Sequence, residues 1–275
     1  MRFAPPLGWN LRSRSEKGVR LRLIVANVNG VRAAARRGGL AWLAAQDADV
    51  ITLQEVRATP DQLAKVLADA GLGAYFVAHT EAERLGRAGV AVLSRVPAEA
   101  VRVGLDGRGE DAGRWIEADV AGLTVVSCYV HTGEADTPRQ EVKYEFLDAM
   151  TDRMASLAGA VVTGDLNIAH REVDIKNWRG NLGKAGFLPV ERAYFDRWFD
   201  AGWVDLGRRF GGPGPGPYTW WSWRGKAFDN DAGWRIDHAL ACSGIAERVR
   251  SVTVGRAPSY AERWSDHAPI VVELD

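Results

Sequence analysis

Residues 20–55, RLRLIVANVNGVRAAARRGGLAWLAAQDADVITLQE, carry the pattern that decides the fold. Apolar and polar residues alternate from Arg20 to Asn29, which predicts a strand. The spacing of apolar residues from Val31 to Gln46 predicts a helix, and the mostly apolar run from Ala48 to Glu55 predicts a second, buried strand. The segment is therefore expected to form a strand, a helix and a strand.

The rest of the chain continues this mixture of strands and helices. Helical patterns cover Asp61–Ala70, Gln140–Leu157 and Val190–Asp200. A hairpin is predicted for Arg114–Val120 and Leu123–Val130, and further strands for Ala160–Thr163, Tyr218–Trp223, Trp234–Ala241, Val249–Val254 and Ile270–Leu274. Because hairpins interrupt any strict alternation of strands and helices, we expect an α/β fold with two packed β-sheets and helices outside them.

One folded domain is expected over residues 19–275, because no stretch inside it has the composition of a domain linker. Residues 1–18, with Pro5, Pro6 and a polar stretch of Arg and Ser, are predicted to be a flexible basic extension. The composition, 47% hydrophobic and 25% charged in 275 residues, is that of a globular protein and not of a disordered or fibrous one.

The charge argues against a simple polyanion-binding protein, because 35 Lys and Arg balance 35 Asp and Glu. Two cysteines, Cys128 and Cys242, are too few for a disulfide scaffold and suit a reducing cytoplasm. No apolar run approaches the roughly 20 residues that span a bilayer, and arginines interrupt the N-terminus where a signal peptide needs an apolar core. We therefore expect a cytoplasmic protein without a membrane anchor.

Candidate chemistry lies where the predicted strands end. Glu55 follows the apolar run Val50–Leu53, so its carboxylate lies at the edge of a buried sheet, where oxygen ligands could hold a hard cation. A surface or salt-bridged glutamate is the more ordinary explanation of this position taken alone. Asn27 and Asn29 have a two-residue spacing at the end of the first strand, although Asn29-Gly30 is also a common turn.

Asp165 and Asn167 follow another short buried strand and would project to the same side if the chain stays extended. A carboxylate beside a carboxamide can orient a water molecule, but the two could equally form an Asx turn that satisfies only local backbone groups.

Ser265-Asp266-His267-Ala268-Pro269 places an imidazole ahead of a proline-constrained strand. Asp237 falls on a predicted strand, where a buried carboxylate needs a partner such as an imidazole or a metal. A capping aspartate and a core histidine are the alternative for the first segment. Tyr129, at a strand end, could reach a phosphate oxygen or could be a core residue.

Five segments, in order, closely resemble motifs of the exonuclease III family of abasic-site endonucleases: Asn27-Val28-Asn29-Gly30, Gln54-Glu55, Gly164-Asp165-Leu166-Asn167-Ile168, Trp234-Arg235-Ile236-Asp237 and Ser265-Asp266-His267-Ala268-Pro269. Phe187–Arg192 and Trp223–Phe228 also resemble that family, and they separate it from relatives that hydrolyse phospholipids or RNA tails. The resemblance runs from about Arg20 to the C-terminus.

This resemblance implies a four-layer α/β sandwich, two packed mixed β-sheets flanked by helices, with the active site at one edge of the sheets. It implies a divalent metal, usually Mg²⁺ with Mn²⁺ as an alternative, and hydrolysis of a DNA phosphodiester. Carried over by position, the metal residues are Glu55 as ligand, Asn27 and Asn29 beside it, and Asp266 nearby.

The resemblance also implies the chemical roles. Asp165 orients or deprotonates the attacking water, and Asn167 and Tyr129 hold the phosphate. His267, oriented by Asp237, stabilises the charged phosphorane. The substrate-binding residues would be Trp220, Trp234 and Ile236, which line a pocket for a base-less sugar, together with Arg57. The three pocket residues could instead be core, since most tryptophans in such a Trp-rich segment must be buried.

The expected reaction is cleavage 5′ to an abasic site, which leaves a 3′-hydroxyl and a 5′-deoxyribose phosphate, with trimming of 3′ ends by the same site. The expected partner is double-stranded DNA with abasic sites or 3′ ends, bound by a nucleoid-associated monomer. One departure affects this expectation: the family usually has Pro and then Asn or Gln soon after Tyr129, whereas this chain has His131-Thr132-Gly133. The sequence therefore does not predict whether this loop contacts the phosphate, or whether endonuclease or exonuclease activity is the stronger.

Two other functions fit the sequence. The first is a phosphodiesterase of the same fold that acts on RNA or small phosphate esters. The second is a non-catalytic DNA-binding protein, which the carboxylates make less suitable because they repel phosphate.

Overall fold

Two six-stranded β-sheets form the centre of the structure, a computed structural model that describes residues 21–84, 86–105 and 112–275. The first sheet has the order β11 (Val249–Val254), β12 (Ile270–Leu274), β1 (Leu21–Asn27), β2 (Val50–Gln54), β4 (Val90–Ser94) and β3 (Phe76–Thr80). The second has the order β5 (Ala100–Val103), β6 (Trp115–Val120), β7 (Leu123–Tyr129), β8 (Ala160–Asp165), β10 (Asp237–Cys242) and β9 (Trp203–Asp205).

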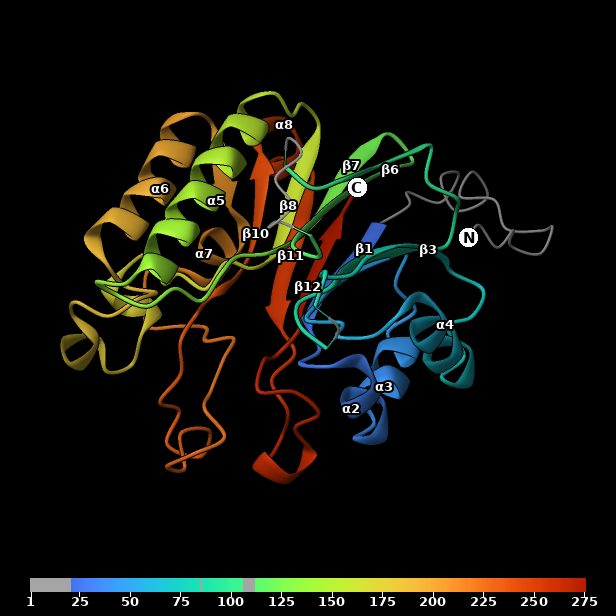
Figure 1. The fold of residues 1–275 in the computed structure, drawn as a ribbon, viewed down its shortest axis with the longest axis horizontal. Helices are drawn as coiled ribbons and strands as arrows, with labels where there is room; N and C mark the ends of the chain where they lie inside the picture. The colour runs from blue at the N-terminus through green and yellow to red at the C-terminus, as the bar shows by residue number, and fades with distance from the viewer. Residues whose placement is uncertain (1–20, 85, 106–111) are drawn as a thin grey trace.

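Helices cover the outer faces of both sheets (Figure 1). The first sheet packs against α2 (Val31–Arg36), α3 (Gly39–Ala45) and α4 (Pro60–Asp69), and the second against α5 (Pro138–Ala155) and α6 (Pro189–Asp200). Two short helices, α7 (Leu206–Gly211) and α8 (Ser243–Ala246), and the 3-10 turns Glu172–Asp174, Trp178–Asn181 and Tyr260–Glu262 lie in the connections.

Three apolar clusters fill the spaces between these layers. The central cluster joins the inner faces of the two sheets and includes Val25, Val92, Ile116 and Val125. The other two lie under the helices on each side. The predicted four-layer α/β sandwich is therefore confirmed.

Strand pairing brings the predicted site residues to one edge of the sandwich. β1 and β2 are parallel, with Asn27 opposite Gln54, so Glu55 follows directly beside Asn27. In the second sheet Asp165 lies between two neighbours, Tyr129 on the parallel strand β7 and Asp237 on the antiparallel strand β10.

The prediction of one helix over Val31–Gln46 is wrong, because α2 ends at Arg36 and α3 begins at Gly39. Gly38 between them has the left-handed φ of 86°, which glycine adopts without steric cost. Gly39 packs so closely on Trp264 that a Cβ atom there would lie 2.7 Å from the indole ring. The break thus allows α3 to turn and pack against the loop that precedes β12.

The predicted strand over Tyr218–Trp223 is also wrong. Within it only Trp220 forms bridges, to Trp234 and to His267, because the backbone N–H groups of Thr219 and Trp220 both donate to the carbonyl of Trp234. The strand predicted from Trp234 begins instead at Asp237. Val249–Val254 and Ile270–Leu274 form strands with the predicted bounds, whereas residues 1–18 lie outside the described residues.

In the described part of the chain, every helix is too short or too polar to cross a bilayer.

Candidate active site

A pocket of about 360 Å³ lies at the edge where the two sheets bring their strand ends together. All the predicted site residues line it except Asn27 and Asp237, which are buried and contact the lining from behind. Thr132, Ala185 and Gly186 line it as well. Sequence reasoning had no specific signal for Ala185 and Gly186, which have no side chain capable of chemistry.

The centre of the pocket is a cluster of Glu55, Asp165 and His267. Each offers one ligand atom, and these atoms lie within 4.8 Å of one another. All three side chains are buried, so two carboxylates are held close together away from bulk water. Such a cluster could hold a metal ion, because a cation offsets the repulsion between the carboxylates.

Asn27 connects the two carboxylates. Its Nδ2 donates to Glu55 Oε1 and to Asp165 Oδ2, both at 2.9 Å, and its Oδ1 accepts from the backbone N–H of Asn29 at 3.0 Å. Asn27 is only 1% exposed. Its amide thus fixes the spacing of the carboxylates, and both of its hydrogens are used in doing so.

The backbone at Glu55 turns out of the strand, with a left-handed φ of 51°. The Glu55 carbonyl accepts from the N–H of Gly30 at 2.8 Å, which joins the ends of the two parallel strands. Arg57 returns toward the pocket and forms an ion pair with the Glu55 carboxylate. Glu55 therefore forms a salt bridge, which was the more ordinary explanation of its position in the sequence. It is also part of the buried cluster.

Asp266 lies on the other side of Asn29. Its Oδ1 accepts from Asn29 Nδ2 at 2.7 Å, and its Oδ2 accepts from Trp220 Nε1 at 3.2 Å. These bonds orient the Asp266 carboxylate in the pocket and tie one pocket tryptophan to it.

His267 is held between two carboxylates. Its Nδ1 lies 2.8 Å from Asp237 Oδ2, and its Nε2 lies 3.8 Å from Asp165 Oδ2. Burial by itself would lower the pKa of His267, but the charge and hydrogen bond of Asp237, then Asp165 and Asp266, raise it above its usual range. The imidazolium is therefore the favoured form at neutral pH, with Nε2–H directed to the pocket side.

Asp165 and Asn167 form an Asx turn, so the chain does not stay extended after β8. The N–H of Asn167 donates to Asp165 Oδ1 at 2.9 Å, and Asn167 has a left-handed φ of 51°. Both side chains nevertheless line the pocket. Burial raises the pKa of Asp165, Asp237 and Glu55 add to that effect, and His267 opposes it.

Tyr129 presents its phenol to the same pocket. Burial raises the pKa of Tyr129, and the negative charges of Glu55 and Asp165 raise it further. The phenol is therefore neutral and able to donate a hydrogen bond.

Thr132 occupies the position where the loop departs from the family pattern, and it lines the pocket. Its carbonyl accepts from the buried Lys143 Nζ at 3.2 Å, and the carbonyl of Asn167 accepts from the same ammonium at 2.9 Å. Lys143 is paired with Glu191 at 2.6 Å. This lysine, which sequence reasoning missed because it reads as an ordinary helix residue, holds two lining segments in place.

An apolar wall adjoins the cluster. The rings of Trp220 and Trp234 meet edge to face, with centroids 6.3 Å apart, and Ile236 packs with them in a small apolar cluster. Gly186 fits behind Trp234, where a Cβ atom would lie 3.3 Å from the indole. The three residues are thus partly core and partly pocket lining.

Comparison with known proteins identifies the family of the chain. The sequence pattern of the Endonuclease/Exonuclease/phosphatase family matches residues 9–267. The chain belongs to this family. The match begins at residue 9, within the segment predicted to precede the domain.

Individual relatives span nearly the whole chain. An exodeoxyribonuclease from Bacillus subtilis (strain 168) is 32% identical, over 91% of this chain and 98% of its own length. The structure of an AP endonuclease from Archaeoglobus fulgidus has a TM-score of 0.84 at 27% identity and covers 93% of this chain and 99% of its own. The 3′ phosphatase NExo from Neisseria, solved with product DNA hairpin, has a TM-score of 0.80 at 30% identity, again over 93% and 99%.

Proposed function

We propose that this chain is a metal-dependent DNA phosphodiesterase of base excision repair, which cleaves 5′ to abasic sites and also trims 3′ ends. The observation that carries the proposal is the buried cluster of Glu55, Asp165 and His267 in a pocket that Tyr129 and Asn167 also line. Relatives named exodeoxyribonuclease, AP endonuclease and 3′ phosphatase support both activities.

A groove of about 410 Å³ next to the pocket supports DNA as the substrate. It shares Asn29 and Arg57 with the pocket and adds Arg32 and Arg36, and the described residues that line it include no carboxylate. Arginine forks suit phosphate oxygens, so a DNA strand in this groove would enter the pocket with its backbone already neutralised.

The donors of the pocket fit a hard divalent cation, Mg²⁺ or Mn²⁺, because carboxylate and carboxamide oxygens surround it and no thiolate lies among the lining residues. Glu55 would hold the cation, with Asn29 and Asp266 close by. A bound cation would neutralise charge on the phosphoryl oxygens. The two hydrogens of the Asn27 amide are already donated to Glu55 and Asp165, so Asn27 is proposed to space the ligands.

Asp165 would accept a proton from the attacking water and hold it in line with the phosphorus atom. The new bond forms between this water oxygen and phosphorus, and the bond from phosphorus to the 3′ oxygen breaks. Tyr129 would donate to a non-bridging oxygen, and His267 would donate from Nε2 because Nδ1 is engaged by Asp237. Asn167 Nδ2 already donates to the Val130 carbonyl at 3.0 Å and to Asp165 Oδ2 at 3.3 Å, so a bond from Asn167 to the phosphate would replace one of these two. The departing 3′ oxygen takes a proton from solvent, so the products carry a 3′-hydroxyl and a 5′-deoxyribose phosphate.

The apolar wall of Trp220, Trp234 and Ile236 would receive the base-less sugar. A sugar without a base can be turned out of the duplex at low cost, and the rings of the apolar wall would exclude an intact nucleotide by shape. Selectivity for damage would then come from fit and not from reading of bases.

We further propose that the protein acts as a monomer, in the cytoplasm and at the nucleoid. Two cysteines in 275 residues are too few for a disulfide scaffold, which suits a reducing compartment, and the described site is built from one chain. Light scattering with and without DNA would test the monomer, and a mass of twice the chain would contradict it.

A substrate panel tests the proposed function. It compares an end-labelled duplex that carries one abasic analogue with the undamaged duplex, a 3′-phosphate end, single-stranded RNA and a small phosphodiester, all with Mg²⁺. We expect a single cut 5′ to the analogue with a 3′-hydroxyl, and slower 3′-phosphate removal. Faster cleavage of RNA or of the small ester would favour the other phosphodiesterase hypothesis, and binding without cleavage would favour a DNA-binding protein.

A further inference from the structure

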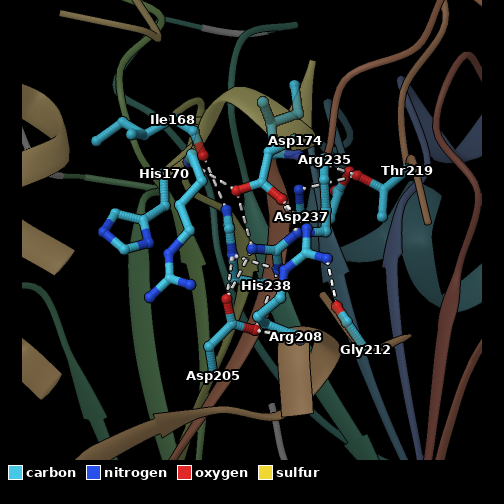
Figure 2. A network of polar contacts seen from close by, with 12 residues as sticks. Ile168, His170, Asp174, Asp205, Arg208, Gly212, Thr219, Arg235, Asp237 and His238 are labelled. Atoms are coloured by element: carbon cyan, nitrogen blue, oxygen red, sulfur yellow. Dashed lines mark hydrogen bonds and ion pairs between the residues drawn. The ribbon is translucent and has the colours of Figure 1, made fainter. Parts of the chain in front are cut away.

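Arg235 is an almost fully buried arginine two residues before Asp237. It is only 2% exposed, and its guanidinium spans two aspartates (Figure 2). Nε and Nη2 donate to Asp174 at 2.7 and 3.2 Å, and Nη1 and Nη2 donate to Asp205 at 3.0 and 2.8 Å. Two carboxylates from distant segments are thus held in fixed directions by one planar group.

The charges of this network balance. Arg208 forms an ion pair with Asp174 and donates to the carbonyls of Gly212 and Gly214 at 2.7 and 2.9 Å. Burial by itself would raise the pKa of Asp174 and Asp205, but Arg235 lowers both below the usual range. Two guanidinium groups therefore face two carboxylates in the interior, an arrangement that tolerates little change of geometry.

The network also reaches the segment that follows Asn167. His238 Nε2 lies 2.8 Å from the carbonyl oxygen of Ile168, which can only accept, so Nε2 carries the hydrogen. His238 Nδ1 is then free to accept from Arg235 Nη1 at 3.3 Å. Arg235 thereby contacts the histidine that holds the Asn167–Ile168 segment.

Residues 234–236 precede β10 and lack a regular strand ladder of their own. The Arg235 N–H donates to the Asp174 carbonyl at 2.8 Å, and Thr219 Oγ1 accepts from the N–H groups of Ile236 and Asp237 at 3.1 and 3.0 Å. The path of the chain into Asp237 thus depends on these local bonds and on the side chain of Arg235.

We propose that Arg235 is a positioning residue for the active site: through Asp174 and Asp205 it fixes the backbone that presents Asp237 to His267. The inference rests on the proposed nuclease function. Arg235 does not line the pocket, so it acts on catalysis through the position of Asp237 and, by way of His238, through the Asn167–Ile168 segment. The hydrogen bond from Asp237 to His267 is the contact that would lose its alignment.

Arg235→Lys tests this inference, because lysine keeps the charge but cannot span both carboxylates. Arg208→Lys is the matched control, because lysine keeps a positive charge beside Asp174 but loses the fork that donates to the carbonyls of Gly212 and Gly214. For both variants kcat and KM for abasic duplex are measured at a temperature well below the thermal midpoint, which is determined separately.

The expected result is a fall in kcat of at least tenfold for Arg235→Lys with KM within threefold, and kcat within twofold of the parent for Arg208→Lys. A folded Arg235→Lys protein with native kcat, or an equal loss of kcat in Arg208→Lys, would overturn the inference. If Arg235→Lys does not fold, the same measurements on Asp205→Asn test the inference.

Asp205→Asn is suitable because asparagine also caps a helix, as Asp205 does for α7, while one charged contact of Arg235 is removed. A slower rate with unchanged KM supports the inference, and a native rate overturns it. Failure of the parent protein to cleave any abasic duplex would instead contradict the proposed function, so the two failures are distinguishable.

Discussion

Asp165 is the residue on which most of the proposed chemistry depends. It is 1% exposed, accepts from Asn27 and from the Asn167 backbone, and lies 3.8 Å from His267 Nε2. Its side chain therefore has a single available direction, toward the cluster and the pocket. That fixed direction is what a group that orients water requires.

Asp165→Asn and His267→Ala are each expected to lower kcat about a thousandfold or more while the Kd for DNA stays within a few fold. Both groups act on the transition state, and the arginines of the neighbouring groove supply ground-state affinity. Single-turnover kinetics and a binding titration check this. Asp69→Asn, at an exposed site on α4, serves as control, and a parallel loss of affinity and rate would refute the roles assigned.

Trp234→Ala is expected to reduce the preference for abasic over undamaged duplex about tenfold in kcat/KM, because the wall that fits the sugar is lost. Trp198→Ala, at a core position on α6, should lower the thermal midpoint with little change in preference. Full preference in a folded Trp234→Ala protein would show that the sugar pocket lies elsewhere.

His131 makes stability depend on pH. Burial, with help from Arg114 and Lys143, lowers its pKa from 6.5 to about 3. Below pH 6.5 His131 is protonated in the unfolded chain but stays neutral in the folded protein. Its contribution to the free energy of unfolding is therefore complete above pH 6.5 and declines as the pH falls toward 3.

The variant His131→Gln should therefore lose less stability on acidification than the parent. Between pH 7.5 and pH 5 the difference in the fall of unfolding free energy should be about 2 kcal/mol. Urea titrations at the two pH values measure it, and the other histidines cancel in the comparison. Equal falls in both proteins would contradict a neutral, half-buried His131.

At the scale of elements, strands were predictable where periodicity alone decides them. Val249–Val254 and Ile270–Leu274 pair with each other, with a register shift between Val249 and Ser251, and both segments are rich in the β-branched residues typical of strands. The sequence pattern predicts the wrong structure where a segment is held by contacts with distant loops. Tyr218–Trp223 has the pattern of a strand, but its backbone hydrogen-bonds to Trp234 and Asp266. The break at Gly38 likewise depends on Trp264, more than 200 residues away, which local spacing cannot reveal.

Gly164, on β8, lies so close to β7 that an added Cβ atom would disrupt the pairing of the two strands. A Cβ atom there would lie 1.9 Å from the carbonyl oxygen of Cys128 on the neighbouring strand β7, and φ is 138°. Gly164→Ala should cost about 3 kcal/mol or more, because β7 and β8 would have to separate beside Asp165.

Gly180→Ala is the control for this variant, since the position has open space and no left-handed φ. It should change the unfolding free energy by less than about 1 kcal/mol. Chemical denaturation compares the two variants. A Gly164→Ala protein as stable as the control would mean that the strands are not packed as described.

At the scale of the molecule, the sequence motifs identified the residues of the site, but not how each is used. Asn27 and Asn29 look equivalent in sequence, yet one bridges two carboxylates from behind and the other orients Asp266. The Arg235 network joins Asp174 of a 3-10 turn to Asp205 of β9, and no local pattern predicts which aspartates a buried arginine will contact. Such partners follow from the three-dimensional fold alone.

The whole molecule thus joins two sheets so that carboxylates from each meet in one pocket, beside a groove rich in arginine. Neither half alone contains the cluster, since Glu55 follows the first sheet and Asp165 ends a strand of the second. The central claim is that this joint cluster hydrolyses DNA with a divalent cation.

Cleavage of an end-labelled abasic duplex, with Mg²⁺ and with excess chelator, tests that claim most directly. We expect one cut 5′ to the abasic position with Mg²⁺, none in chelator, restoration by added Mg²⁺ or Mn²⁺, and a higher Mg²⁺ requirement in Glu55→Gln. Undiminished cleavage in chelator would show that the cluster does not act through a divalent cation.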